Sequence, residues 1–169
     1  MYNKTDKITD YVTIEMENGD KITVKLDSSA APVTVENFKK LVSENFYDGI
    51  IFHRVIKGFM IQGGDPTGTG MGGSKKKIKG EFASNGVKNP ISHRRGVISM
   101  ARTQIPDSAS SQFFICHADA TFLDGEYAAF GEVVEGMEAV DRIAETQTDF
   151  RDKPLKDQKI RSVYFSSVS

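Results

Sequence analysis

Cysteine is nearly absent from this chain, which has Cys116 as its single cysteine in 169 residues. One cysteine cannot form an intrachain disulfide, and it leaves no Cys-x-x-Cys pair for a structural metal site. The histidines His53, His93 and His117 are scattered and lack the spacing of zinc ligands. The sequence therefore predicts no metal and no other cofactor.

Long apolar runs are also missing. No stretch approaches the roughly 20 apolar residues that a membrane-spanning helix needs, and the first residues lack the apolar segment of a secretory signal. Without such a signal, the glycosylation sequon at Asn3 carries little weight. We expect a cytoplasmic protein with a polar lead-in over residues 1–10 and a single domain over residues 11–169.

An excess of charge of either sign is absent, because 22 Lys and Arg residues stand against 23 Asp and Glu residues. This balance gives no reason to expect nucleic acid or an acidic membrane as a partner. The basic cluster at Lys75–Lys79 has no interleaved aromatic residues that could stack on bases, so we interpret it as a solvated loop. We therefore expect no nucleic-acid partner and no membrane partner.

Alternating apolar and polar residues predict a mainly β-structure. Residues 11–16 and 22–26 alternate in this way around Asn18-Gly19, a dipeptide that favours a hairpin turn. Further short runs are typical of strands: residues 50–55, 59–62, 97–100, 112–116, 128–133 and 160–168.

Two segments have the apolar spacing of helices instead. The first covers about residues 32–44, where Pro32 suits the first helical position and Thr34 is a candidate cap. The second covers residues 136–145. Many short strands with only two helices favour a closed or nearly closed antiparallel barrel.

Several sequence patterns imitate catalytic or nucleotide-binding motifs. Gly68, Gly70 and Gly73 satisfy G-x-G-x-x-G, but they lead into a lysine-rich segment and not into a helix, so we interpret them as a mobile loop. Cys116 and His117 would point to opposite faces of a strand. The serines Ser99 and Ser111 lack a nucleophile-elbow sequence. We therefore predict neither a nucleotide site nor a hydrolytic site.

Three segments concentrate unusual residues: Phe52 to Asp65, Ser110 to Ile115, and Phe122 to Gly131. Strand alternation predicts that Phe52 shares a face with Arg54, Met60 with Gln62, and Gln112 with Phe114. Each residue alone is typical of a core or surface position. Together they predict one surface of mixed Arg, Gln, Phe and Met.

The pattern F-H-R-x-I-x-G-F-M-x-Q-G-G-D, followed by S-Q-F-F-I and L-D-G, closely resembles the signature of the cyclophilins from Tyr11 almost to the C-terminus. The short connection between Gly63 and Glu81 is similar to that of the compact bacterial-type members. This resemblance implies an eight-stranded antiparallel β-barrel capped by two α-helices, with substrate bound on the outer wall. It also implies a peptidyl-prolyl cis/trans isomerase that assists protein folding. A proline-peptide binding module or holdase without turnover is the alternative.

The resemblance also implies roles for individual residues. Arg54 becomes the catalytic arginine, with Phe59 and Gln62 in the same catalytic group. The implied substrate-binding residues form an apolar proline pocket and the groove beside it: Met60, Gly70, Ala101, Arg102, Gln112, Phe114, Phe122, Leu123 and Tyr127.

Four positions depart from the best-studied eukaryotic pattern. Phe122 replaces a tryptophan, Tyr127 a histidine and Arg102 an asparagine, and Lys57 stands where proline is common. An indole N–H is lost at Phe122, so the resemblance implies only weak binding of cyclosporin-type inhibitors. The implied partners are proline-containing peptides and unfolded protein chains, and the implied state is a monomer.

Overall fold

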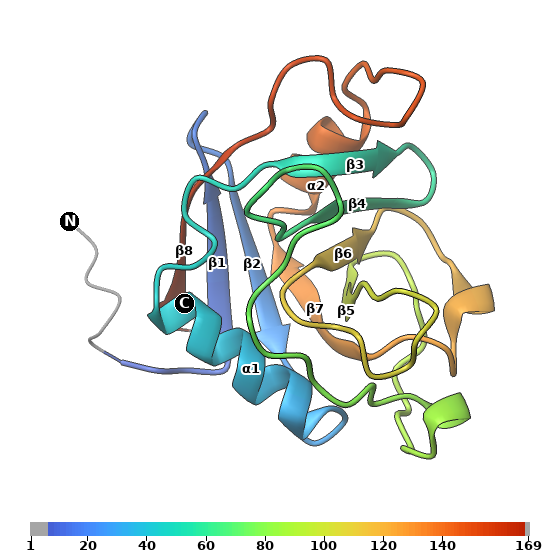
Figure 1. The fold of residues 1–169 in the computed structure, drawn as a ribbon. Helices are drawn as coiled ribbons and strands as arrows, with labels where there is room; N and C mark the ends of the chain where they lie inside the picture. Colours follow the sequence, from blue (N-terminus) through green and yellow to red (C-terminus); the bar gives the residue numbers. More distant parts are fainter. Residues whose placement is uncertain (1–6, 168–169) are drawn as a thin grey trace.

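The computed structural model describes residues 7–167 as one curled sheet with two helices (Figure 1). The strand order is β3-β4-β6-β5-β7-β2-β1-β8, and every pairing is antiparallel. The strands are β1 (Tyr11–Met16), β2 (Lys21–Leu26), β3 (Phe52–Ile56), β4 (Met60–Gly63), β5 (Val97–Met100), β6 (Phe113–Cys116), β7 (Ala129–Glu135) and β8 (Ile160–Ser166). The helices are α1 (Pro32–Ser43) and α2 (Met137–Ala144), with single 3-10 turns at Ala83–Asn85 and Thr121–Leu123.

The expected strands and helices are all present, and their observed ends differ by at most two residues from those predicted. Residues 1–6 of the expected lead-in, with the sequon at Asn3, and Val168 at the end of the last expected strand lie outside the described residues. In Figure 1, α1 crosses the lower end of the strands and α2 lies near the upper end.

The two edges of the sheet meet just outside β3 and β8. The N–H of Gly49 donates to the Ile160 carbonyl at 2.8 Å, and the Ile160 N–H donates to the Ile50 carbonyl at 2.9 Å. The Phe52 N–H adds a third bond, 2.9 Å long, to the Gln158 carbonyl. The sheet is thus a half-barrel whose edges are joined by a few main-chain bonds, which confirms the predicted eight-stranded fold.

Aromatic rings fill the inside of this half-barrel. Phe38 on α1 and Phe113 on β6 meet edge to face with centroids 5.8 Å apart. Tyr47 lies 5.4 Å from Phe113 and Phe130 lies 5.1 Å from Phe38, and all four side chains are fully buried. Each such ring removes about 150–250 Å² of surface from water, so this cluster is a large part of the core. The inside of the half-barrel is therefore occupied by side chains.

The cap of α1 differs from the sequence prediction. Thr34 is not the N-cap, because Ala31 occupies that position and Pro32 opens the helix. The buried Glu81 carboxylate accepts the Thr34 N–H at 2.6 Å, the Thr34 hydroxyl at 2.7 Å and the Val33 N–H at 3.3 Å. A carboxylate at this end also complements the helix dipole. The cap thus comes from a residue distant in sequence, which a local capping pattern cannot predict.

The predicted common face of Phe52 and Arg54 is wrong. Phe52 pairs with Gly63 and Arg54 pairs with Gln62, so β3 carries an extra residue, His53, relative to β4. Such a bulge breaks the two-residue alternation of a strand. Phe52 consequently enters the main core, while Arg54 is exposed on the outer wall. The bulge is what brings Arg54 to the face that Gln62 occupies.

Candidate active site

A small apolar pocket of about 140 Å³ opens on the outer wall of the sheet. Its floor comes from Met60 on β4, Phe114 on β6 and Leu123 in a 3-10 turn, which form a hydrophobic cluster separate from the main core. Its volume is several times the ~30 Å³ share of a water molecule, enough for a small ring. All residues that line it were predicted: Arg54, Phe59, Met60, Gln62, Ala101, Arg102, Phe114, Leu123 and Tyr127.

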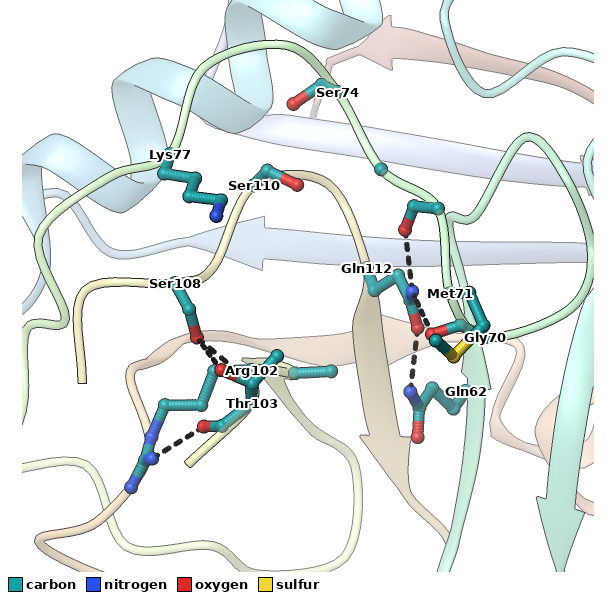
Figure 2. Close-up of a pocket in the computed structure, with 13 residues that line it drawn as sticks. Gln62, Gly70, Met71, Ser74, Lys77, Arg102, Thr103, Ser108, Ser110 and Gln112 are labelled. Carbon is teal, nitrogen blue, oxygen red and sulfur yellow. Dashed lines mark hydrogen bonds between the residues drawn. The ribbon is translucent and has the colours of Figure 1, made fainter. Parts of the chain in front are cut away.

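A second, polar pocket of about 280 Å³ lies beside the first and shares Gln62, Ala101 and Arg102 with it (Figure 2). The predicted residues Gly70 and Gln112 line this second pocket. Sequence reasoning missed the rest of its lining, because no motif marks these loop residues, most of which are small or carry a hydroxyl. They are Met71, Gly72, Gly73, Ser74, Lys77, Thr103, Ser108 and Ser110.

Phe122 lines neither pocket. Its side chain is 73% exposed, and its ring centroid lies 5.7 Å from that of Phe59. Phe122 therefore extends the apolar rim outward from Phe59 and leaves the pocket floor to other residues. This is the one predicted site residue that the structure places outside both pockets.

A row of side-chain hydrogen bonds connects the two pockets. Arg54 Nη1 donates to Gln62 Oε1 at 3.4 Å, and Gln62 Nε2 donates to Gln112 Oε1 at 2.9 Å. Gln112 Nε2 then donates to the carbonyls of Gly70 at 2.9 Å and Gly72 at 2.8 Å, as Figure 2 shows. The amide donors of Gln112 therefore bind the glycine loop, the segment that contains Gly68, Gly70, Gly72 and Gly73. Within residues 7–167 the long bond to Gln62 is the one hydrogen bond of the exposed Arg54 side chain, so most of its five donors stay free.

The glycine loop is wound around the buried carboxylate of Asp65. Main-chain N–H groups of Thr67, Thr69, Gly70 and Gly72 donate to it at 2.7–3.1 Å. A Cβ atom on Gly72 would collide with this carboxylate, so glycine is required there. The sequence predicts only a mobile loop here. The structure adds a single anionic centre that orders it.

Asp65 should make stability depend on pH in the acid range. Burial acts to raise its pKa, but hydrogen bonds from Thr67, Gly72 and Gly70 outweigh it and hold the pKa at about 2, below the ordinary 3.8. A depressed pKa stabilises the fold above the unfolded value and loses that contribution as pH falls toward 2. A shift of this size corresponds to about 2 kcal/mol.

Urea unfolding of wild type and Asp65→Asn between pH 6 and pH 2 measures this contribution. We expect the wild type to be more stable than the variant by about 2 kcal/mol at pH 6, with the difference shrinking toward zero near pH 2. A difference that stays constant over this range would contradict the electrostatic role.

Arg102 forms the wall between the two pockets in a way that the sequence did not predict. Its guanidinium lies between two rings, 4.7 Å from the Phe82 centroid and 4.8 Å from the Tyr127 centroid. It donates to the main-chain carbonyls of Glu126 and Thr103. Planar stacking and a fixed donor geometry distinguish arginine from lysine. The side chain of Arg102 thus fixes Tyr127 at the pocket edge.

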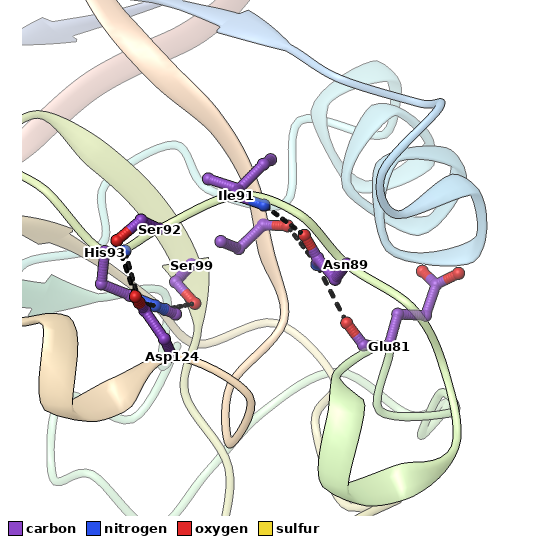
Figure 3. Close-up of polar contacts among 8 residues, drawn as sticks. Glu81, Asn89, Ile91, Ser92, His93, Ser99 and Asp124 are labelled. Carbon is purple, nitrogen blue, oxygen red and sulfur yellow. Dashed lines mark hydrogen bonds and ion pairs between the residues drawn. The ribbon is translucent and has the colours of Figure 1, made fainter.

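Behind Phe114 lies a polar row in which the buried Ser99 and His93 connect to the exposed Asp124 (Figure 3). His93 Nε2 is 2.9 Å from Ser99 Oγ, and His93 Nδ1 is 2.9 Å from Asp124 Oδ1. The His93 ring is nearly parallel to Phe114 at 6.0 Å. Burial lowers the pKa of His93 although Asp124 acts to raise it.

This row has the residue types of a hydrolytic triad, but Ser99 is fully buried, so a substrate cannot reach its oxygen. The row contacts the pocket floor from behind, through the stacking of His93 on Phe114. Ser111 is also fully buried, and its hydroxyl donates to the Gly64 carbonyl. Burial raises the pKa of Cys116 to about 12, which keeps the thiol protonated and unreactive.

Residues 7–167 contain no group of three or more His, Cys, Asp or Glu side chains that could hold a metal ion. In the same part of the chain, no helix has the length and apolar character needed to cross a bilayer. At the outer wall, the exposed guanidinium of Arg54 lies beside the apolar pocket.

Comparison with known proteins agrees with this geometry. The family described as "Cyclophilin type peptidyl-prolyl cis-trans isomerase/CLD" matches residues 11–165. The chain belongs to the cyclophilins. Its activity is the isomerisation of peptidyl-prolyl bonds.

Relatives of this cyclophilin occur in bacteria and eukaryotes. It is 44% identical over 166 residues to a peptidyl-prolyl cis-trans isomerase of Acinetobacter baylyi, covering 92% of this chain and 86% of the relative. It is 44% identical over 141 residues to the isomerase ppi1 of Schizosaccharomyces pombe, covering 83% and 89%. A cyclophilin-type isomerase of Cryptosporidium parvum, crystallised in the presence of the dipeptide Ala-Pro, has a TM-score of 0.85 at 34% identity, covering 94% of this cyclophilin and 99% of that chain.

Proposed function

We propose that Arg54 is the catalytic residue of this isomerase and that the apolar pocket receives the proline ring of the substrate. The observation that carries the proposal is the exposed guanidinium with free donors at the edge of the pocket lined by Met60, Phe114 and Leu123. Holding the ring there gives the acyl half of the X–Pro bond a fixed partner against which to rotate.

The reaction needs no bond cleavage, nucleophile or cofactor. Resonance in the peptide bond creates a rotational barrier of about 18–20 kcal/mol, and X–Pro bonds interconvert over tens to hundreds of seconds. Rotation removes this resonance, so the prolyl nitrogen becomes more basic and the carbonyl loses conjugation. A guanidinium that donates to these atoms stabilises the twisted state preferentially.

Arg54 does not account for the whole rate gain. An acceleration of about 10⁵ requires roughly 7 kcal/mol of preferential transition-state stabilisation. One charge-assisted hydrogen bond contributes about 1.5–3 kcal/mol. The remainder comes from the preorganised pocket, where Gln62 and the main chain at Arg102 are placed to bind the peptide backbone. Gln112 acts mainly by holding the loop at Gly70.

A peptide titration followed by amide NMR tests this site. A short X–Pro peptide should shift the signals of Phe59, Met60, Ala101 and Phe114 most strongly, and should show exchange between its cis and trans forms. The largest shifts centred on β1 and β8 would refute the pocket. Binding without exchange would favour the holdase alternative.

Unfolded chains with exposed prolines are the proposed clients, because the pocket recognises mainly the proline and its neighbours. The Ala-Pro dipeptide present with the Cryptosporidium parvum relative supports this choice. A free, buried Cys116 suits a reducing cytoplasm, the compartment we propose. We propose a monomer as the working form.

Cyclosporin-type inhibitors should bind this protein weakly. The tryptophan of better-studied members supplies an indole N–H that Phe122 lacks, and here the Phe122 ring stands exposed beside Phe59. A lost hydrogen bond of this kind costs about 1 kcal/mol, roughly a fivefold change in affinity. Phe122→Trp should tighten inhibition by that factor with little change in kcat/KM for a short peptide. Nanomolar inhibition of the wild type would contradict this expectation.

A further inference from the structure

His117 holds the chain on both sides of Phe59. Its own N–H donates to the Phe59 carbonyl at 2.9 Å, and its ring atom Nδ1 accepts the Gly58 N–H at 2.8 Å. Gly58 lies at the turn between β3 and β4 with a φ of 79°, and Phe59 follows it directly. Two hydrogen bonds to one residue therefore hold the main chain next to the Phe59 ring.

The His117 ring is fixed at its other end as well. Because Nδ1 accepts a hydrogen bond, the proton of the neutral ring is on Nε2, which lies 3.1 Å from Asp141 Oδ1 on α2. Arg95 binds the same carboxylate through both oxygens, at 2.7 and 2.8 Å. Arg95 also donates to the His117 carbonyl at 2.8 Å. The ring is thus part of a closed network that connects the β3–β4 turn to α2.

The two hydrogen bonds of His117 act on an exposed turn, where the Phe59 N–H also donates to the Ile56 carbonyl at 2.9 Å and the Phe59 ring packs against the cluster of the pocket floor. Phe59 is half-buried, and the ring next to it, Phe122, is exposed. The turn residues Lys57 and Gly58 are exposed too. Arg54, in contrast, lies within β3 and is positioned by strand pairing with Gln62. Loss of the His117 ring should therefore displace the apolar edge of the pocket and leave the guanidinium in place.

We propose that His117 is a positioning residue for substrate binding, which acts by holding the Gly58–Phe59 turn against the proline pocket. This inference rests on the proposed role of Phe59 in that pocket. The pocket edge binds the proline ring in the ground state and in the twisted state alike, so its displacement raises KM more than it lowers kcat.

Steady-state kinetics of His117→Ala and His117→Asn on an X–Pro peptide provide the test. We expect His117→Ala to raise KM roughly fivefold or more with kcat within about twofold of wild type. The amide oxygen of asparagine can take the place of Nδ1 and accept the Gly58 N–H, so His117→Asn should restore most of the wild-type KM. His117→Gln places its amide near Asp141 instead and should behave like His117→Ala, which keeps the comparison available if the alanine variant does not fold.

Kinetics of Phe59→Ala distinguish a failure of the pocket assignment of Phe59 from a failure of the positioning role of His117. If Phe59→Ala leaves KM unchanged, the pocket assignment of Phe59 fails. If Phe59→Ala raises KM but His117→Ala does not, the pocket stands and the positioning role of His117 is overturned. Equal KM values for His117→Asn and His117→Ala would also overturn it, because the acceptor at Nδ1 would then be irrelevant.

Discussion

Replacement of Arg54 by alanine should lower kcat/KM about 10²–10³-fold, the loss typical of removing one preorganised donor at a transition state. The guanidinium is exposed, and within residues 7–167 it has only a long hydrogen bond, to Gln62. The variant should therefore fold as the wild type does. A protease-coupled assay on an X–Pro peptide measures the change, with thermal unfolding as the check on stability.

Two further variants control this result. Arg54→Lys keeps the charge but loses the planar set of donors, so it should recover less than about a tenth of the activity. Lys57→Ala removes an exposed cation from the β3–β4 turn without touching the pocket lining and should remain active. Wild-type turnover by Arg54→Ala would refute the catalytic role. Equal losses in both alanine variants would point to the general positive potential and away from Arg54 itself.

Alanine at Phe113 should destabilise the protein by about 3–5 kcal/mol, whereas alanine at Phe114 should mainly impair activity. The two residues are adjacent on β6 and point to opposite sides of the sheet. Phe113 contacts Phe38, Tyr47 and Phe52 in the core. Phe114 forms the pocket floor, where loss of a buried aromatic contact costs about 2 kcal/mol or more of binding.

Urea unfolding and peptide kinetics on both variants separate these effects. Phe113→Ala should lower the urea midpoint strongly, with near wild-type kcat/KM for the fraction that remains folded. Phe114→Ala should lower kcat/KM about 30-fold or more with the smaller loss of stability. If Phe114→Ala lost more stability and Phe113→Ala lost more activity, the faces of β6 would be misassigned.

Strand alternation predicted part of this site correctly. Gln112 and Phe114 do face the outer wall while Phe113 enters the core, because β4, β6 and β5 pair without interruption there. The same rule failed at Phe52 and Arg54, where a bulge shifts the register. A bulge depends on how two strands meet, and residues within one strand do not encode it visibly.

Contacts between distant segments were beyond sequence reasoning altogether. His93, Ser99 and Asp124 look unrelated along the chain, and only the fold brings them into one hydrogen-bonded row. The Glu81 cap of α1 and the stacked Arg102 have the same origin. Residue roles that depend on tertiary neighbours became predictable only through the resemblance to a family. The resemblance assigns no role to His117, so the contacts of its ring with the turn at Gly58 were not predicted.

The aromatic rings inside the half-barrel leave no room there for a polypeptide substrate. With the interior occupied by rings such as Phe38 and Phe113, we expect a polypeptide to lie across the outside, so that neither of its ends has to be threaded. A proline in the middle of a long chain is then as accessible as one near a terminus. From the proposed outer-wall site, we expect the enzyme to act on successive prolines of one proline-containing chain.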